Sequence, residues 1–240
     1  MKKFFTIIGG MGTQATESYV HLLNKRTPAH NDQDYLNYIL VNHATVPDRT
    51  AYITDPENNP SPLPPLEEDI QQQSKLGPEF FALPCNTAHY FYDQLQSVTD
   101  VPILHMPRLA VGAIAKKFPH ARKVGLIATK GTLKDKVYDK EIADAGYEIV
   151  HPTDEIADET MDLIYKGVKE QDYVDPKLYH HILNQMVNEL GSDVVILGCT
   201  EISVAEERAG NHDYPVIDAQ SELVDESIRL AEKMQKNKAS

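Results

Sequence analysis

The sequence predicts an α/β fold of two similar lobes, each with a parallel β-sheet flanked by helices, related by a pseudo-twofold axis. First, short apolar runs alternate with helical segments, which is the pattern of βαβ units. Second, the four apolar runs of the first half recur in the same order in the second half. Third, Cys85 and Cys199 have the same separation as Ile103 and Ile217, 114 residues (199 − 85 and 217 − 103). We therefore expect a ligand cleft between the lobes, where strand ends converge.

The elements follow in chain order from apolar runs and helical periodicity. The predicted strands are residues 4–8, 38–42, 80–83, 103–105, 123–128, 147–150, 194–197 and 216–217. The predicted helices are 16–26, 65–75, 108–117, 134–145, 158–169 and 176–190. Proline in 55–65 predicts a surface loop rather than a helix or central strand, either an inert excursion or a lid. We assign residues 1–104 and 216–240 to the first lobe and 105–215 to the second.

Composition limits the classes of partner. A chain of 240 residues can bury one large core or two moderate ones, and no apolar stretch is long enough to span a membrane. The net charge of −13 argues against a nucleic-acid partner, but a few local cations and amides can still hold a small anion. Met1-Lys2-Lys3 leads directly into a short strand, so we expect no signal peptide and a reducing cytoplasm.

The two cysteines lie in matching contexts. Each follows an apolar run that stops at Pro84 or Gly198, and each precedes residues that begin a helix. A lone Cys at a strand end is usually a small buried hydrophobe. A disulfide or a metal site is only weakly indicated, because Cys85 and His89, four residues apart, are the one pair spaced to bind a metal together. The duplicated context favours a reactive thiol on each side of a substrate, facing helix amides.

Other polar residues follow the same strand ends. Glycines in the 9–16 loop let backbone amides approach an anion, although the spacing fits neither a dinucleotide fingerprint nor a P-loop. Asn86-Thr87 and Thr200-Glu201 offer amides and hydroxyls beside each thiol, which suits the binding of a carboxylate. Arg49 suits a bidentate carboxylate clamp, but taken alone it is expected to form a surface ion pair with Asp48 or a nearby acid.

Three blocks resemble one known family. They are Gly9-Gly10-Met11-Gly12 with Ala15-Thr16, Pro84-Cys85-Asn86-Thr87-Ala88-His89, and Leu197-Gly198-Cys199-Thr200-Glu201-Ile202. The chain resembles the aspartate/glutamate racemase superfamily from residue 4 to its last helix. It is most similar to the aspartate racemase branch, because glutamate racemases usually have an Asp-Ser-Gly turn first and His in place of Glu201.

The resemblance implies racemisation of an acidic amino acid without pyridoxal phosphate or any other cofactor. Cys85 and Cys199 would be the acid and base on opposite faces of Cα, one as thiolate and one as thiol. It further implies a homodimer and a substrate site of Met11, Gly12, Arg49, Asn86, Thr87, Thr129, Lys169 and Thr200. In this set Arg49 binds the side-chain carboxylate and Lys169 assists. The chain departs from the family pattern at Thr13, where Pro is usual, and at residues 170–172, where a Gly-containing turn is usual.

Several alternatives stay open. A solute-binding or sensor module with the same lobes would explain the glycine loop and Arg49 but not the paired thiols. A dithiol redox protein would need the two Cα atoms within about 7 Å. Maleate isomerases and hydantoin racemases share the two-cysteine plan, and Arg49 together with the Gly9-Gly10-Met11-Gly12 block favours an acidic amino acid over their substrates. The choice between aspartate and glutamate depends on loop geometry.

Overall fold

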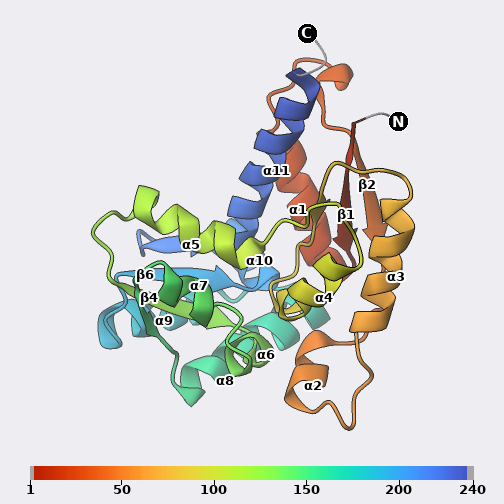
Figure 1. Cartoon of the computed structure of the whole chain (residues 1–240). Coiled ribbons are helices and arrows are strands. Elements are labelled where there is room, and N and C mark those ends of the chain that lie inside the picture. Colours follow the sequence, from red (N-terminus) through yellow and green to blue (C-terminus); the bar gives the residue numbers. More distant parts are fainter. Residues whose placement is uncertain (1–2, 237–240) are drawn as a thin grey trace.

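The computed structural model describes residues 3–236, which fold around two parallel β-sheets flanked by helices (Figure 1). The first sheet has the order β2-β1-β3 and the second the order β5-β4-β6-β7. The strands are β1 Phe5–Gly9, β2 Tyr38–Asn42, β3 Phe81–Ala82, β4 Lys123–Ala128, β5 Glu148–Val150, β6 Val194–Gly198 and β7 Val216–Asp218. The predicted α/β class with two parallel sheets is confirmed.

Helices connect the strands. The α-helices are α1 Thr13–Arg26, α2 Arg49–Thr54, α3 Leu63–Ser74, α4 Tyr92–Ser97, α5 Met106–Lys117, α6 Lys130–Lys134, α7 Asp139–Asp144, α8 Asp154–Asp162, α9 Pro176–Asn184, α10 Thr200–Ala209 and α11 Ala219–Lys236. Two short 3-10 turns, η1 Asp32–Asp34 and η2 Thr87–Phe91, and two π-helical turns, η3 Leu163–Lys169 and η4 Gln185–Glu189, complete the set. Among the helices of residues 3–236, none is long and apolar enough to cross a bilayer.

The sheets reproduce the predicted repeat, with two differences. Ile103 makes only an isolated parallel bridge to Phe81, so the expected strand 103–105 is reduced to one bridge at the sheet edge. Strand β7 pairs with β6 in the second sheet, although the predicted boundary places 216–240 in the first lobe. Residues 1–2 and 237–240 of that lobe lie outside the described residues. Apart from β7, the lobe boundaries stay a prediction.

Two local predictions were wrong. The predicted helix 134–145 is interrupted between α6 and α7, where Lys136 has φ +53° and cannot continue a right-handed helix. The predicted proline loop ends early, because α3 begins at Leu63 and places Pro64 and Pro65 in its first turn. Proline is tolerated there because these positions donate no intrahelical hydrogen bond.

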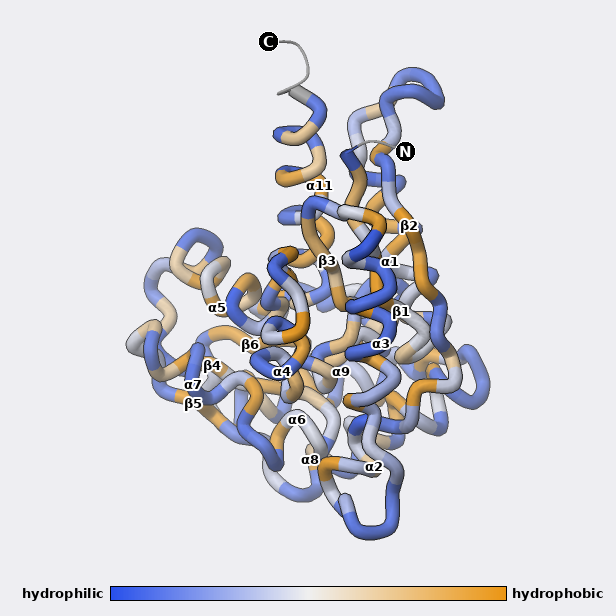
Figure 2. Tube along the Cα trace, turned by 45° about the vertical axis from the view of Figure 1, so that its right-hand side comes forward, coloured by the Kyte–Doolittle hydropathy of each residue, from blue (hydrophilic) through white to orange (hydrophobic). Residues whose placement is uncertain are grey.

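The main apolar core is shared by the two sheets. Phe5 and Ile7 of β1 belong to the same buried cluster as Val124 and Leu126 of β4 and Leu223 of α11. In Figure 2 apolar segments run through the strands, while the helices alternate in hydropathy. Each such side chain stabilises the fold by about 1.5–3 kcal/mol on burial. The shared cluster therefore holds the sheets together on the side of α1, α5 and α11.

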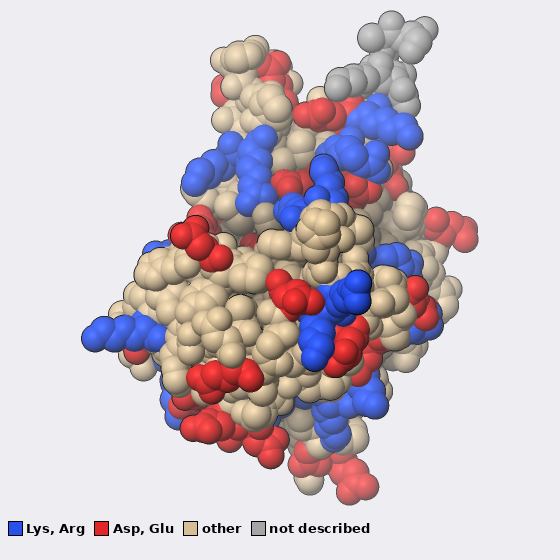
Figure 3. Space-filling view, turned by 90° about the vertical axis from the view of Figure 1, so that its left-hand side faces the viewer, with Lys and Arg blue, Asp and Glu red and all other residues tan. Residues whose placement is uncertain are grey.

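The carboxyl ends of the strands meet on the other side of the molecule. Thr87, after β3, lies 3.0 Å from Thr129, after β4, measured between hydroxyl oxygens. The loop after β1 turns at Gly10, which has φ +90° and whose added Cβ would lie 2.5 Å from the backbone of His43. Only glycine fits this close approach. On the face in Figure 3, basic side chains are interspersed with acidic ones rather than gathered into a continuous patch.

Candidate active site

The first thiol follows strand β3. Cys85 is buried, and its carbonyl oxygen lies 2.9 Å from Nδ1 of His89. The N–H of Met106 donates to Nε2 of the same ring at 3.1 Å, so Nδ1 carries the proton and donates to Cys85. Burial lowers the pKa of His89, which keeps the ring neutral. His89 therefore positions the Cys85 backbone, and both ring nitrogens are used on backbone groups instead of a metal.

The second thiol precedes helix α10 as its N-cap residue. Cys199 is buried, and its Sγ donates to Oε2 of Glu201 at 3.0 Å. Burial raises the pKa of Cys199 well above its ordinary value, the Glu201 charge raises it further, and Lys169 acts in the opposite direction. Cys199 is therefore held as a protonated thiol.

Arg49 begins α2 and is buried, with 7% of its surface exposed. It donates to the carbonyl oxygens of Met11 at 3.0 Å, Pro47 at 3.0 Å and Val46 at 3.3 Å. Among the described residues it has no ion pair, and its Nε has no hydrogen-bond partner. The expected surface ion pair with Asp48 is wrong, because loop carbonyls hold the guanidinium inside the cleft.

Lys169 lies between acidic side chains from both halves of the chain. Its Nζ lies 3.8 Å from Oε1 of Glu201, 4.0 Å from Oδ2 of Asp48 and 4.1 Å from the centre of the Tyr165 ring. Burial alone would lower the pKa of Lys169, but Glu201 above all raises it, so the ammonium group stays charged. The Tyr165 hydroxyl donates to Asp48 at 3.1 Å, and burial raises its pKa to about 12.

The side-chain amide of Asn86 has a hydrogen-bond partner at its oxygen and none at its nitrogen. The Tyr138 hydroxyl donates to Oδ1 of Asn86, while Nδ2 is buried without a partner. This hydrogen bond sets the orientation of the amide. Arg49 Nε and Asn86 Nδ2 are the only buried side-chain nitrogens without a partner in residues 3–236. Buried donors of this kind call for a ligand or an ordered water.

Threonine hydroxyls link the two halves of the site. Thr87 lies 3.0 Å from both Thr129 and Thr132, which are 3.1 Å apart. Thr200 is the first residue of α10, and its hydroxyl donates to Oε2 of Glu201 at 3.4 Å.

Nine of the ten predicted site residues line one nearly closed cavity. The cavity measures about 10 Å³, which is room for about one water molecule. The cavity is lined by Met11, Asp48, Arg49, Thr50, Cys85, Asn86, Thr87, Thr129, Tyr165, Lys169, Cys199, Thr200 and Glu201.

The tenth predicted residue, Gly12, lies outside this cavity. It lines an adjoining open hollow of about 470 Å³, which shares Asp48, Arg49, Lys169 and Glu201 with the inner cavity. The hollow therefore leads from solvent to the thiols past these four charged side chains. Within residues 3–236, no group of three or more His, Cys, Asp and Glu side chains is arranged to hold a metal ion.

The sequence interpretation did not predict several contacts of the site. It placed the pair Thr200-Glu201 beside Cys199 but did not predict that the Glu201 carboxylate contacts the thiol, which its position two residues after Cys199 at a helix start could have indicated. Tyr138 and Tyr165 lie in ordinary helical surroundings, and no local pattern points to them. Their roles follow only from the packing of the two halves.

The chain is similar to known racemases over most of its length. Residues 8–226 match the family model described as Asp/Glu/Hydantoin racemase. The structure of Picrophilus torridus aspartate racemase superposes with a TM-score of 0.80 at 29% identity, covering 96% of this chain and 94% of that one. A broad specificity amino-acid racemase of Bacillus subtilis is 24% identical over 92% of this chain and 95% of its own length. Francisella tularensis glutamate racemase shares the fold, with a TM-score of 0.67 at 16% identity over 98% and 82% of the two chains.

Proposed function

Because the chain belongs to the Asp/Glu/Hydantoin racemase family, we propose that it racemises an acidic amino acid, with aspartate as the main substrate and glutamate as a second one. Racemase activity accords with the named amino-acid racemases that it resembles. The observation that carries the substrate proposal is the pair of unpartnered buried donors, Arg49 Nε and Asn86 Nδ2, in the cavity that holds both cysteines.

The charges of the cavity suit a dicarboxylic amino acid. Arg49 and the free amide of Asn86 provide separate donors for two carboxylates, with Arg49 on the side-chain carboxylate. The Thr87 and Thr200 hydroxyls add donors near the α-carboxylate. Glu201 supplies a carboxylate that can accept from the substrate ammonium group. A hydantoin ring carries no carboxylate and offers Arg49 only neutral carbonyl oxygens, so it would leave the buried positive charge of Arg49 without a counter-charge.

The two thiols lie beside groups of opposite charge. Burial alone would lower the pKa of Arg49, but the Cys85 sulfur raises it, followed by Asp48, so the guanidinium stays charged beside Cys85. Cys199 is held as the thiol by burial and by Glu201. Because Cys199 holds its proton and Cys85 faces the Arg49 guanidinium, we assign Cys199 as the acid and Cys85 as the base in this direction of the reaction.

The exchange of protons then balances. The Cys85 thiolate takes the α-proton, the C–H electron pair stays on Cα, and Cys199 gives its S–H proton to the opposite face. Cys85 ends as a thiol and Cys199 as a thiolate, which is the state needed for the other enantiomer. Arg49 and Lys169 stabilise the negative charge during the transfer.

Both cysteines are free thiols and must stay reduced to work. We therefore place the protein in the reducing cytoplasm. Oxidation should abolish the reaction, and a thiol reductant should restore it.

The test is incubation in D₂O, without added cofactor, with L-aspartate, L-glutamate or L-alanine. We expect inversion with deuterium at Cα, fastest for aspartate. Cys85→Ser and Cys199→Ser should each reduce inversion about 10²–10⁴-fold. Circular dichroism of each variant shows whether the fold is kept. Fastest inversion of alanine would instead support a broad-specificity racemase, the candidate favoured by the Bacillus subtilis relative. Absence of exchange with all three substrates would refute the proposal.

A further inference from the structure

Each thiol is connected to the start of a later helix through the residue four positions after it. In the first half this residue is His89, whose ring donates to the carbonyl oxygen of Cys85 at 2.9 Å. The same ring accepts the N–H of Met106, the first residue of α5, at 3.1 Å. One imidazole therefore spans the distance from the segment that carries Cys85 to the beginning of α5.

The second half makes the same connection with two side chains. Ser203 stands four positions after Cys199, and its N–H donates to the Cys199 carbonyl oxygen at 3.1 Å. The Ser203 hydroxyl donates to Oδ1 of Asp218 at 2.5 Å, and the same oxygen accepts the N–H of Gln220 at 3.0 Å. Because Gln220 is in the first turn of α11, this connection also ends at the start of a helix.

The internal repeat shows that the two connections occupy equivalent places. Ser203 follows His89 by 114 residues (203 − 89), and Gln220 follows Met106 by the same 114 (220 − 106). This is also the separation of the two cysteines. A serine side chain is much shorter than a histidine ring, so it does not reach the amide of Gln220. The carboxylate of Asp218 fills the remaining distance.

The bond between Ser203 and Asp218 is charge-assisted near neutral pH. Burial raises the pKa of Asp218 to about 6, and above that pH its carboxylate only accepts hydrogen bonds. The single hydroxyl proton of Ser203 is therefore used on Asp218 rather than on the Cys199 carbonyl oxygen, which lies 3.4 Å away. Such bonds are roughly twice as strong as neutral ones. They fix the first turn of α10, which begins after Cys199, to the end of β7.

We propose that Ser203 and Asp218 act as one positioning unit for Cys199, as His89 does for Cys85. The inference rests on the proposed reaction, in which each thiol acts on one face of Cα. Because Cys199 is the N-cap residue of α10, release of that first turn would move its sulfur relative to the substrate. A displacement of about 1 Å can slow a reaction about 10²-fold. Loss of one unit should therefore slow proton removal from one face of Cα and leave the other face unchanged.

Elimination from 3-chloroaspartate separates the two faces, because it needs only the thiol that removes the α-proton. The thiolate takes that proton, the C–H electron pair forms the Cα=Cβ bond, and chloride leaves from Cβ. Hydrolysis of the resulting enamine gives ammonia and oxaloacetate. Chloride release is measured separately for the two enantiomers at pH ~8, where Asp218 is a carboxylate. Cys85→Ser and Cys199→Ser show which thiol serves which enantiomer.

The two units should affect opposite enantiomers. Ser203→Ala and Asp218→Ala should each slow release from the enantiomer that Cys199 serves by about 10–100-fold, and the double variant should be no slower, because both changes break the same connection. Asp218→Asn keeps an oxygen that accepts both bonds and should stay close to wild type. His89→Leu should slow the other enantiomer. Equal loss for both enantiomers, or no loss in Ser203→Ala, would overturn the proposal.

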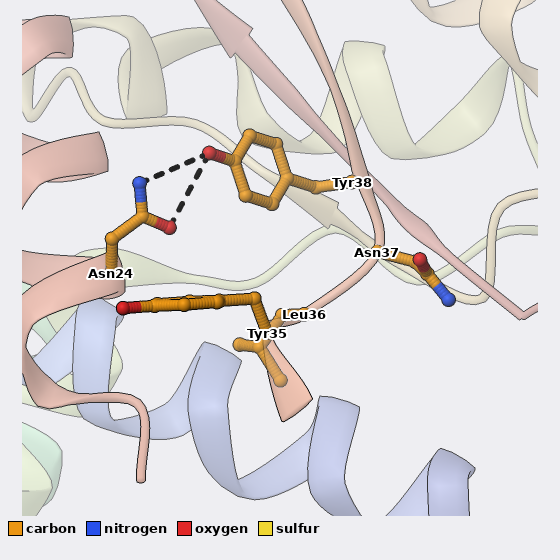
Figure 4. Close-up of a pocket in the computed structure, with 5 residues that line it drawn as sticks. All are labelled: Asn24, Tyr35, Leu36, Asn37 and Tyr38. Carbon is orange, nitrogen blue, oxygen red and sulfur yellow. Dashed lines mark hydrogen bonds between the residues drawn. The ribbon is translucent and has the colours of Figure 1, made fainter. Parts of the chain in front are cut away.

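The matched control removes a hydroxyl that joins a strand to a helix at the other end of the first sheet. Tyr38 begins β2, and its hydroxyl donates to Oδ1 of Asn24 in α1 at 3.4 Å (Figure 4). Both side chains line a surface hollow of about 460 Å³ at the amino end of β2, whereas the thiols lie at the carboxyl ends of strands. Tyr38→Phe should release chloride from both enantiomers as the wild type does.

Carbon-13 NMR tests the positioning independently of the reaction. The chain has two cysteines, so protein labelled at the cysteine Cβ gives two signals, which the Cys85→Ser and Cys199→Ser variants assign. Ser203→Ala should shift the Cys199 signal and leave that of Cys85 in place, and His89→Leu should do the reverse. This result would support the two units even if the chain failed to racemise aspartate. An unmoved Cys199 signal in Ser203→Ala would refute them even if the racemase proposal holds.

Discussion

Arg49→Lys gives the most direct test of how the substrate is held. Lysine keeps the positive charge but lacks the planar guanidinium. In Arg49 the terminal nitrogens of that group donate to Met11, Val46 and Pro47, while Nε stays free for a ligand. A hydrogen bond that involves a charged group contributes about 1.5–3 kcal/mol. Loss of the bond from Nε to the side-chain carboxylate should therefore lower kcat/KM for aspartate about 10–150-fold.

The assay compares two substrates on the same variant. Aspartate racemisation and α-proton exchange of alanine in D₂O are both measured, because alanine has no side-chain carboxylate to lose. Alanine exchange should change by much less than aspartate racemisation. Arg229→Lys is the matched control, since its guanidinium lies on the surface and pairs with Glu226 at 2.7 Å. That variant should behave as wild type with both substrates.

The same loss for aspartate and alanine would refute this reasoning. It would mean that Arg49 acts only by holding the loop carbonyls, and that the side-chain carboxylate binds elsewhere. Thermal unfolding of Arg49→Lys separates a weaker fold from a weaker site, because those carbonyls would lose their donors.

Three further predictions concern groups around the thiols and the core. Glu201→Gln removes a negative charge beside Cys199. Burial first and then that charge raise the pKa of Cys199, so the variant should have the alkaline limb of its kcat/KM–pH profile at lower pH. If the limb does not move, it reports the titration of another group. Tyr138→Phe frees the Asn86 amide, so KM should rise about 2–13-fold at nearly constant kcat, whereas a loss confined to kcat would contradict a positioning role. Burial raises the pKa of Asp218 from 3.8 to about 6. The contribution of Asp218 to the free energy of unfolding is therefore highest below pH ~4, where Asp218 is protonated in both states, and it falls as pH rises through about 6 and the buried carboxyl must ionise. Asp218→Asn should therefore gain up to roughly 3 kcal/mol in urea unfolding near pH ~8 and almost nothing near pH ~3, and an equal gain at both would reject this account.

The sequence identified the strands and thiols because their signals are local. An apolar run that ends at Pro84 or Gly198 marks the end of a buried strand, and the following residue must then lie at the carboxyl edge of a parallel sheet. The equal separation of Cys85 and Cys199 from matching strands then predicts a shared cleft. Both thiols do line one cavity.

Features that depend on packing between distant segments were not predictable in this way. Beside Asp48 in the sequence, Arg49 has the pattern of a surface ion pair, yet Asp48 instead accepts from Tyr165 and lies near Lys169. Nothing near Tyr138 in the sequence indicates its bond to Asn86. The break in helix 134–145 is likewise invisible in a sequence with ordinary helical composition.

The distribution of contacts between the two halves indicates how a substrate reaches the thiols. An inner cavity with room for about one water cannot admit an amino acid, so the halves must separate at this edge. The contacts there are polar, such as Thr87 to Thr129 and Tyr165 to Asp48, and each contributes only about 0.5–1.5 kcal/mol. On the opposite side the halves share a buried apolar core, which is far more costly to open. We expect separation to pivot about that core, so that closure brings a thiol from each half to opposite faces of Cα and excludes water from the carbanion in the same step.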